Sequence, residues 1–345
     1  MTTEQPMMQA ILQHGYGHPR DVLRLGQVPC PSPGPGDVLI RVRGTCVNTP
    51  DWATVAGVPA ILRLVTGLRR PGHPVRGSDV AGVVAAAGPQ VTDLQSGDEV
   101  FGSLWDGSAR PTAGSFAEYA VAPSAQVARK PAALSFADAA ASVMSGLTAL
   151  IAMRDVGRVR DGSRVLVNGA SGGVGTMAVQ IAASMGAEVT GVCGTSNVEL
   201  VRSLGAARVI DYTAEDFTRD PQRYDVILDN VLNRPPRVTA RLLAPRGVFI
   251  PNSIGNTGGL FAGLPRVVRA MVMGLGSTTV KTVTLTVTRE NLGVLAGLLE
   301  SGAVRVVIDK AYSLDCAAAA VAHMLGHHAR GQVAITVPGR DFRRN

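Results

Sequence analysis

The sequence has few of the features that mark secreted, membrane-spanning or disulfide-bonded chains. Only four of its 345 residues are cysteine. They are scattered without a CxxC pair, which argues against a disulfide framework or a four-cysteine zinc loop and favours a reducing, cytoplasmic location. No basic region followed by an apolar core opens the chain, so no signal peptide is predicted. No run reaches about 18 consecutive apolar residues, so no membrane span is predicted.

Aromatic residues and lysines are also scarce. Aromatics make up 4% of the chain and hydrophobic residues 46%, so the core must be built from alanine, valine, leucine and isoleucine. The net charge of +7 comes almost wholly from arginine, since there are only three lysines. A basic chain could bind nucleic acid or attract an anionic cofactor. Without a dense basic run and interleaved aromatics, we expect neither a nucleic-acid nor a membrane partner.

The length suggests about two domains. The first third contains short strands separated by proline and glycine, which predicts a small, mostly antiparallel β domain. Near residue 132 the pattern changes, and Ser135 is a plausible N-cap for a helix that continues to Arg154. From Ser163 onward a strand, a turn and a helix follow one another and repeat, which is typical of a doubly wound parallel sheet. The predicted fold class is therefore α/β.

The predicted elements follow from these patterns. Strands are expected at residues 7–13, 37–42, 78–85, 96–101, 164–168, 188–192, 208–210, 224–228, 247–250, 280–287 and 332–337. Helices are expected at residues 135–154, 174–185, 197–204, 238–243, 289–299 and 315–327. Within the less clear stretch 255–280, apolar and basic residues at 260–274 favour an amphipathic helix, over the active site or at a subunit contact.

The most informative stretch is a glycine-rich turn at residues 169–175, which follows a strand and opens a helix. A helix that starts in this way offers unpaired N–H groups and a positive dipole end to a pyrophosphate. Gly172 lets the backbone approach the phosphates, and Gly175 lets the helix pack closely on the strand. Ala170 replaces the first glycine of the usual G-x-G-x-x-G, with Gly169 just before it. The turn predicts a nucleotide-binding site.

The end of the next strand favours NADPH over NADH. NAD enzymes usually carry Asp or Glu there, about 20 residues beyond the motif, to hold the ribose hydroxyls. Residues 192–197 contain no carboxylate, and the first to follow is Glu199. A 2′-phosphate would instead meet the hydroxyl groups of Thr195 and Ser196. The alternative is that these are ordinary loop residues and that either cofactor binds.

Landmarks of one family are spread along the whole chain. They lie at residues 33–39, 47–52, 77–82, 97–102, 145–150, 169–175, 192–212 and 328–333. Together they resemble the zinc-free medium-chain dehydrogenase/reductases, the group that includes quinone oxidoreductases. The resemblance implies a GroES-like β domain made of residues 1–131 and 288–345. It also implies an inserted Rossmann domain at 132–287, with the active site between the two.

The resemblance further implies a cofactor site. Its expected members are Asn48 and Thr148 at the nicotinamide end, Ser171, Gly172, Gly173 and Val174 at the pyrophosphate, Thr195, Ser196, Asn197 and Tyr212 near the 2′-phosphate, Asn230, Asn252, Ile254 and Gly255 at the nicotinamide ribose or ring, and Arg330 and Gly331 closing over the cofactor. A family lysine is missing around Asn197, so Tyr212 and Arg202 would carry more of the phosphate recognition.

No metal is expected. The positions that match the catalytic zinc ligands of related alcohol dehydrogenases are Asn48, Ser78 and one near Ser142, none of which is a good zinc ligand. Asp79 matches an acidic position in those relatives, and we expect it to make a structural ion pair. Asp51 could donate a proton to an enolate, but capping backbone N–H groups is the favoured role. Asn48 is the other weak catalytic candidate, and water could supply the proton.

The implied activity is zinc-independent hydride transfer from NADPH to a small hydrophobic quinone or α,β-unsaturated carbonyl. A conjugated carbonyl needs no Lewis acid, because hydride can add at the β-carbon and leave an enolate. One alternative is a zinc-free carbonyl or alcohol dehydrogenase. Another is a non-catalytic NADPH-binding protein, because Ala53 stands where some quinone reductases carry a tyrosine. The strand expected at 280–287 could pair internally or across a homodimer.

Overall fold

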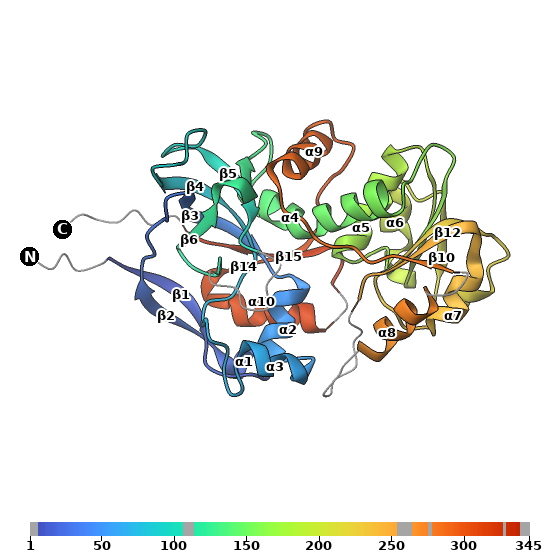
Figure 1. Ribbon diagram of the computed structural model, residues 1–345, viewed down its shortest axis with the longest axis horizontal. Helices are drawn as coiled ribbons and strands as arrows, with labels where there is room; N and C mark the ends of the chain where they lie inside the picture. Colours follow the sequence, from blue (N-terminus) through green and yellow to red (C-terminus); the bar gives the residue numbers. More distant parts are fainter. Residues whose placement is uncertain (1–5, 106–113, 254–263, 275–277, 327–328, 339–345) are drawn as a thin grey trace, which may run out of the picture.

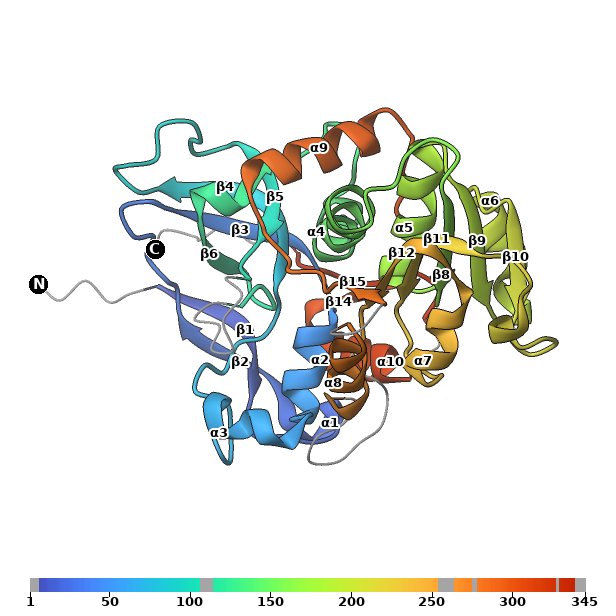
Figure 2. The same cartoon turned by 45° about the vertical axis from the view of Figure 1, so that its right-hand side comes forward.

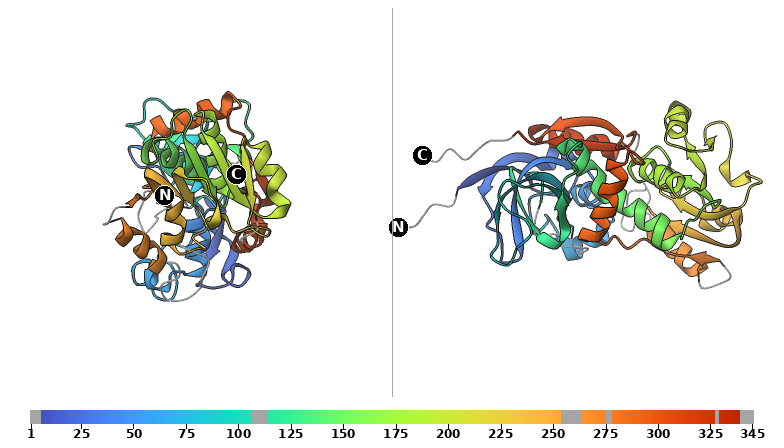
Figure 3. Two further views of the ribbon diagram at one scale, coloured as in Figure 1. Left: turned by 90° about the vertical axis from the view of Figure 1, so that its right-hand side faces the viewer. Right: turned by 90° about the horizontal axis from the view of Figure 1, so that it is seen from above.

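Two sheets with their helices lie side by side along the long axis of the molecule (Figure 1). The computed structural model describes residues 6–105, 114–253, 264–274, 278–326 and 329–338. Seen from above, the two bodies meet at a junction that a helix, coloured green, crosses (Figure 3, right). The α/β class and the combination of a GroES-like domain with a Rossmann-like sheet are confirmed. The domain boundaries stay a prediction.

The first body contains a seven-stranded sheet and a hairpin. The hairpin pairs β1 (Met7–Gln13) with β2 (Leu23–Pro29). The sheet has the order β14-β15-β3-β4-β5-β7, with β6 paired to β3. Its strands are β3 (Asp37–Cys46), β4 (Asp79–Ala87), β5 (Glu99–Ser103), β6 (Tyr119–Pro123), β7 (Val127–Arg129), β14 (Ile308–Ser313) and β15 (Gln332–Thr336). Only β14 and β15 pair in parallel, so the predicted antiparallel character is confirmed.

The second body is a parallel sheet of six strands in the order β10-β9-β8-β11-β12-β13. The strands are β8 (Arg164–Asn168), β9 (Glu188–Cys193), β10 (Arg208–Asp211), β11 (Tyr224–Asp229), β12 (Leu243–Pro251) and β13 (Thr279–Val280). The helices that alternate with them are α5 (Gly173–Ser184), α6 (Val198–Ser203), α7 (Pro236–Thr239) and α8 (Leu264–Met273). The strand order reverses beside β8, and a crevice at the carboxyl ends of strands at such a switch point is where α/β proteins bind ligands.

The helix α4 (Phe136–Leu150) joins the two bodies. Ser135 caps it as predicted, since its Oγ accepts a hydrogen bond of 3.1 Å from the N–H of Asp138. The helix packs on β3 and β4 of the first sheet and on α5 of the second body, and it continues into a π-helical turn, Ile151–Val156. The segment is apolar and long enough to cross a membrane by composition, but 83% of its most apolar window is buried inside the protein. It is therefore the core helix of this fold.

The remaining helices cover the first body. They are α1 (Pro19–Val22), α2 (Thr49–Ala56), α3 (Arg63–Thr66), α9 (Arg289–Glu300) and α10 (Ala317–Leu325). The helix α9 lies across α4 at the top of the molecule (Figure 2). The helix α2 packs against α1 and α10.

Two predicted elements were wrong in part. Of the expected strand at 280–287, only Val280 belongs to β13, which pairs with β12, and the N–H of Lys281 also donates to the carbonyl of Phe249 at 3.0 Å. Residues 282–288 have no strand partner among the described residues. Alternation is present there, because Val283, Leu285 and Val287 pack against the core. Burial of every second residue shows that one face of the segment is buried, but it does not show that the segment pairs with a neighbouring strand. The helix expected at 238–243 is shorter, since α7 ends at Thr239 and β12 begins at Leu243.

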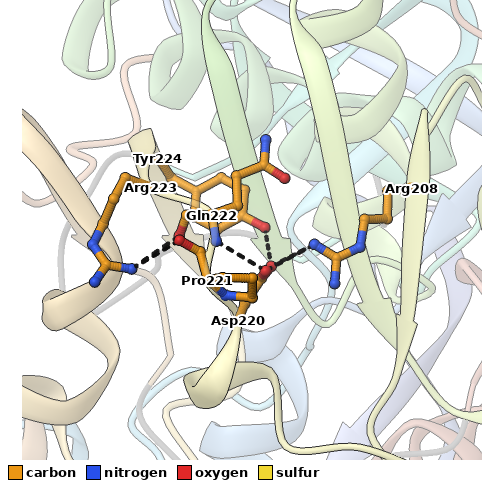
Figure 4. A network of polar contacts seen from close by, with 6 residues as sticks. All are labelled: Arg208, Asp220, Pro221, Gln222, Arg223 and Tyr224. Carbon is orange, nitrogen blue, oxygen red and sulfur yellow. Dashed lines mark hydrogen bonds and ion pairs between the residues drawn. The ribbon is translucent and has the colours of Figure 1, made fainter.

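A buried polar cluster fixes one edge of the second sheet (Figure 4). The carboxylate of Asp220, on the turn before β11, accepts two hydrogen bonds of 2.8 Å from Nη1 of Arg208 in β10. It also accepts the hydroxyl of Tyr224, which is fully buried, and the N–H of Gln222 at 3.1 Å. Burial opposes ionisation of Asp220, but the hydrogen bonds from Arg208 and Tyr224 outweigh it, and the pKa of this carboxyl is lowered.

Candidate coenzyme site and active site

The glycine-rich turn has the geometry that its sequence predicts. Gly169 follows β8 with φ +77°, a conformation that residues with a Cβ rarely adopt. A Cβ on Gly175 would lie 2.0 Å from the carbonyl oxygen of Gly169, so only glycine lets α5 pack this closely. Gly172 is the N-cap of α5 and makes no side-chain cap. The turn therefore presents free backbone donors at a helix N-terminus, as phosphate sites do.

The last strand of the first body closes on this turn. The N–H of Gly331 donates to the carbonyl of Ser171 at 2.8 Å, and Gly331 forms a parallel bridge with Gly172. Gly331 has φ +82°, and a Cβ there would lie 2.1 Å from the carbonyl oxygen of Val307. Both predicted members, Gly172 and Gly331, thus come together although they are far apart in the chain.

Arg330 links the turn to the end of β9. Its Nε donates to Oδ1 of Asn197 at 2.6 Å and its Nη2 donates to the carbonyl of Ser196 at 2.5 Å. The side-chain amide of Asn197 donates in turn to Oγ of Ser171 at 3.3 Å. Four predicted site residues from three segments therefore form one hydrogen-bonded chain, and a guanidinium lies beside the segment expected to meet the 2′-phosphate.

The rest of that region is exposed and polar. Tyr212 is 58% exposed, and its hydroxyl lies 3.1 Å from where a Cβ on Gly194 would stand. Thr195 and Thr213 share a hydrogen bond of 2.8 Å between their hydroxyls. The carboxylate of Asp211 was not anticipated at this edge, because it ends β10 and not β9. Hydrogen bonds from Thr195 and Thr213 lower its pKa.

Arg202 has a different position from the one expected. It forms an ion pair with Glu199 one helical turn earlier on the exposed face of α6. Arg330, which the sequence places near the opposite end of the chain, is the arginine that contacts Ser196 and Asn197. Among the described residues, Arg330 is the cation that contacts this segment, and no contact with it is seen for Arg202.

At the carboxyl ends of β11 and β12, buried polar groups lack partners. The amide of Asn252 donates to Oδ1 of Asn230 at 2.7 Å, while Nδ2 of Asn230 is buried with no hydrogen-bond partner among the described residues. Asp229 beside it is fully buried, burial raises its pKa, and its Oδ1 accepts the amide of Asn168 at 2.7 Å. Leu232, which donates its N–H to the same oxygen at 2.8 Å, has φ +52°. Strained backbone of this kind clusters at functional sites.

Gln332 is a residue that the sequence did not single out. It is fully buried, and its side chain lies 2.8–3.1 Å from where a Cβ on Gly173 would stand. Its Oε1 accepts a weak hydrogen bond from the Sγ of Cys46 at 3.7 Å, and its Nε2 has no partner within the described parts of the chain. An unsatisfied buried donor needs a partner. With Asn230, it gives two unpaired donors around the first turn of α5, which fits a bound dinucleotide.

A buried network begins at α2. The N–H of Asn48 donates to Oδ2 of Asp51 at 2.8 Å, which confirms the capping role of Asp51. Oδ1 of Asp51 accepts the hydroxyl of Ser78 at 2.8 Å. The amide of Asn48 donates to Oδ2 of Asp79 at 2.8 Å, and the N–H of Met144 donates to the same oxygen at 2.9 Å. The ion pair expected for Asp79 was wrong, since its partners among the described residues are the neutral donors Asn48 and Met144.

Burial dominates the electrostatics of this network. It raises the pKa of Asp51 to about 6, against the opposing effects of the Asn48 and Ser78 hydrogen bonds. It raises the pKa of Asp79 to about 7, and the neighbouring charge of Asp51 adds to the shift. Thr148 lies one turn beyond Met144 in α4 and is 9% exposed. The structure therefore links Asn48 and Asp51 with Met144 of α4, through Asp79 and the start of α2, and Thr148 lies one turn further along the same helix.

Other predicted members are placed as follows. Gly173 and Val174 form the first turn of α5. Ile254 and Gly255 lie outside the described residues. Within the described parts of the chain, no three His, Cys, Asp or Glu side chains are grouped so that they could hold a metal ion.

The fold and the turn define the chain as a two-domain, nucleotide-binding α/β protein. Residues 34–132 match the alcohol dehydrogenase GroES-like domain, and residues 204–335 match the zinc-binding dehydrogenase family. The chain is 32% identical over 346 residues to a chloroplastic quinone oxidoreductase of Triphysaria versicolor, covering 95% of this chain and 98% of that one. A trans-enoyl reductase of Aspergillus terreus is 39% identical over 208 residues, or 57% of this chain and 56% of its own.

A solved structure agrees with these matches. The quinone oxidoreductase from Coxiella burnetii superposes with a TM-score of 0.84 at 26% identity, covering 96% of this chain and all of that one. The chain therefore belongs to the medium-chain dehydrogenase/reductase superfamily and is quinone oxidoreductase-like. It is an oxidoreductase that binds a nicotinamide cofactor.

Proposed function

We propose that the protein is an NADPH-dependent, zinc-independent reductase of quinones or α,β-unsaturated carbonyl compounds. The observation that carries the coenzyme assignment is the hydrogen-bonded chain from Ser171 through Asn197 to Arg330, which sets a guanidinium beside Ser196. Residues 192–197 contain no carboxylate, and the nearby carboxylate of Asp211, at the end of β10, accepts hydrogen bonds from Thr195 and Thr213. The acceptor class is supported by the relatives, which are named quinone oxidoreductase and trans-enoyl reductase.

The coenzyme would be held by this chain's own donors. The backbone of Gly172 and Gly173 would face the pyrophosphate, and the unpaired amides of Asn230 and Gln332 would face its nicotinamide half. When bound, NADPH supplies a hydride for an electron-poor carbon. The protein's contribution is to orient coenzyme and acceptor at the junction of the two bodies and to exclude water.

We base the proposed zinc independence on the groups that stand where zinc ligands would be. Asn48 and Ser78 are hydrogen-bonded to Asp79 and Asp51, and their amide and hydroxyl groups are poor zinc ligands. A conjugated acceptor suits such a site, because the charge left by hydride addition is delocalised as an enolate. Oxidation of NADPH with a cyclic enone, followed by product analysis, tests this assignment. We expect the saturated ketone; the allylic alcohol would instead indicate ordinary carbonyl reduction.

The coenzyme preference should depend on Arg330. Arg330→Ala is expected to weaken NADPH binding by roughly 10- to 100-fold, since a hydrogen bond to a charged group contributes about 1.5–3 kcal/mol. NADH binding should change by less than about threefold, because NADH lacks the 2′-phosphate. Equilibrium titration of both nucleotides measures this, with the ion-paired Arg202→Ala as the matched control. Equal losses for both nucleotides would show that Arg330 only positions the loop.

We also propose that the protein forms a homodimer. Residues 282–288 have no strand partner among the described residues, and Thr282, Thr284 and Thr286 are exposed. Such an edge can pair with a second copy of the chain. A cytoplasmic location is proposed as well, on the four cysteines, which are all free.

A further inference from the structure

A second buried cation lies on the first body, in the segment that leads into β4. Arg76 is only 4% exposed. One end of its guanidinium donates from Nη2 to the carbonyl of His73. Its Nε–H is buried and has no hydrogen-bond partner among the described residues. A buried, charged donor without an acceptor is costly, so this position calls for a ligand.

Arg76 lines a small cavity together with Asp51, Ser78 and Trp105. Its volume is about 20 Å³, which is room for a single oxygen-sized group. Asp51 and Arg76 face each other there without a direct ion pair among the described contacts. The two oxygens of Asp51 are already used, since Oδ1 accepts from Ser78 and Oδ2 from the N–H of Asn48. Arg76 is the positively charged residue in the lining of the cavity.

The cavity adjoins the expected reaction site. Asp51 and Ser78 connect it by two hydrogen bonds to Asn48 at the start of α2. Asn48 is linked in turn through Asp79 to Met144 of α4, the helix that packs on both bodies.

We propose that Arg76 binds the carbonyl oxygen of the acceptor and stabilises the negative charge that develops on it. This inference rests on the proposed reductase function. Hydride from NADPH forms a new C–H bond at the β-carbon. The alkene electron pair becomes the bond between the α-carbon and the carbonyl carbon, and the carbonyl π pair moves to oxygen beside Arg76. Water then protonates the α-carbon, giving the saturated ketone, NADP⁺ and hydroxide.

The guanidinium takes the part that a Lewis acid takes elsewhere, in a water-poor cavity where a fixed charge acts most strongly. The cavity admits a compact oxygen and no larger group, which selects ketones, aldehydes and quinones whose carbonyl is unhindered. Carboxylates offer the same oxygen with a permanent charge, so a small carboxylate should bind there as an inhibitor.

The test compares Arg76→Gln and Arg76→Lys with the wild-type protein, and uses the exposed Arg69→Gln as matched control. Arg76→Gln is expected to lower kcat with a cyclic enone by roughly 100- to 1,000-fold, a loss typical of removing one oxyanion donor. Arg76→Lys should recover part of the rate, and the Kd for NADPH should stay within about twofold of the wild-type value in both variants. Retention of kcat within about threefold in folded Arg76→Gln and Arg76→Lys would overturn the inference.

A binding measurement separates this inference from the proposed function. Benzoate is titrated against each protein in the presence of NADP⁺. Benzoate binding to the wild type that is lost in Arg76→Gln and kept in Arg69→Gln supports the oxygen site even if no acceptor turns over. If the wild type turns over an acceptor, and Arg76→Gln keeps both its rate and its benzoate binding, the reductase function is supported and the role of Arg76 is refuted. No turnover and no benzoate binding would overturn both.

Discussion

Asp220→Asn is expected to lower the free energy of unfolding by about 2–4 kcal/mol at pH 7. The substitution removes the charge that holds Nη1 of Arg208 and the hydroxyl of Tyr224, and truncating one partner of a buried pair is far costlier than the pair itself contributes. Because Arg208 is 40% exposed in its side chain, water recovers part of its hydration, which sets the lower end of the range. Urea unfolding measures the difference.

The matched control is Arg223→Gln, which lies three residues from Asp220. Arg223 is exposed, and within the described parts of the chain its guanidinium reaches only the carbonyls of Pro221 and Gln222, so its loss should cost less than about 0.5 kcal/mol. The pKa of Asp220 is lower in the folded state than in the unfolded chain. Its contribution to the free energy of unfolding is therefore fully present above the pKa of the unfolded chain, and it is lost as the pH falls through the pKa of the folded state. An Asp220→Asn effect that stayed constant down to pH 2 would contradict the ionic interpretation.

Asp79→Asn is expected to stabilise the folded protein by roughly 2–3 kcal/mol more at pH 8 than at pH 5. Oδ2 of Asp79 accepts from both Asn48 and Met144, while Oδ1 is buried without a hydrogen-bond partner among the described residues. An asparagine can keep its oxygen toward these two donors and put its amide where Oδ1 stands. The change removes a buried charge without removing a hydrogen bond.

The sign follows from the pKa of Asp79, which burial raises to about 7. Between the unfolded pKa of about 4 and pH 7 the folded protein holds a proton that the unfolded chain has released, so stability falls as the pH rises. Asp51→Asn is the contrast, because both oxygens of Asp51 accept hydrogen bonds and an amide would oppose one donor. Thermal unfolding at pH 5 and 8 measures both. Equal pH dependence in the wild type and Asp79→Asn would refute the assignment.

Much of the fold could be predicted because the residues required by its turns are visible in the sequence. The positive φ at Gly169 and the contact at Gly175 admit little but glycine, so their spacing located the turn and the sheet around it. Residues 281–287 show where this reasoning ends. Their alternation identifies the buried face, whereas strand pairing depends on a neighbour that the pattern does not specify.

The site was predictable only in part for a related reason. Arg330 and Gly331 came from the family resemblance, since nothing local connects them to Ser171 across the fold. Gln332 and Arg76 belong to no periodic pattern or motif, and an isolated polar residue is ordinarily expected at the surface. Their unpaired buried atoms, which appear only in the folded structure, are what mark them.

The most direct test of the proposed function is the oxidation of NADPH and NADH by the purified protein, followed by the loss of reduced-nicotinamide absorbance with a quinone and a cyclic enone as acceptors. A strong chelator is added in a parallel series. We predict turnover that prefers NADPH and is unaffected by the chelator, as expected from Arg330 beside Ser196 and from the amide and hydroxyl groups of Asn48 and Ser78. Loss of activity with the chelator, or NADPH binding without turnover of either acceptor, would contradict it.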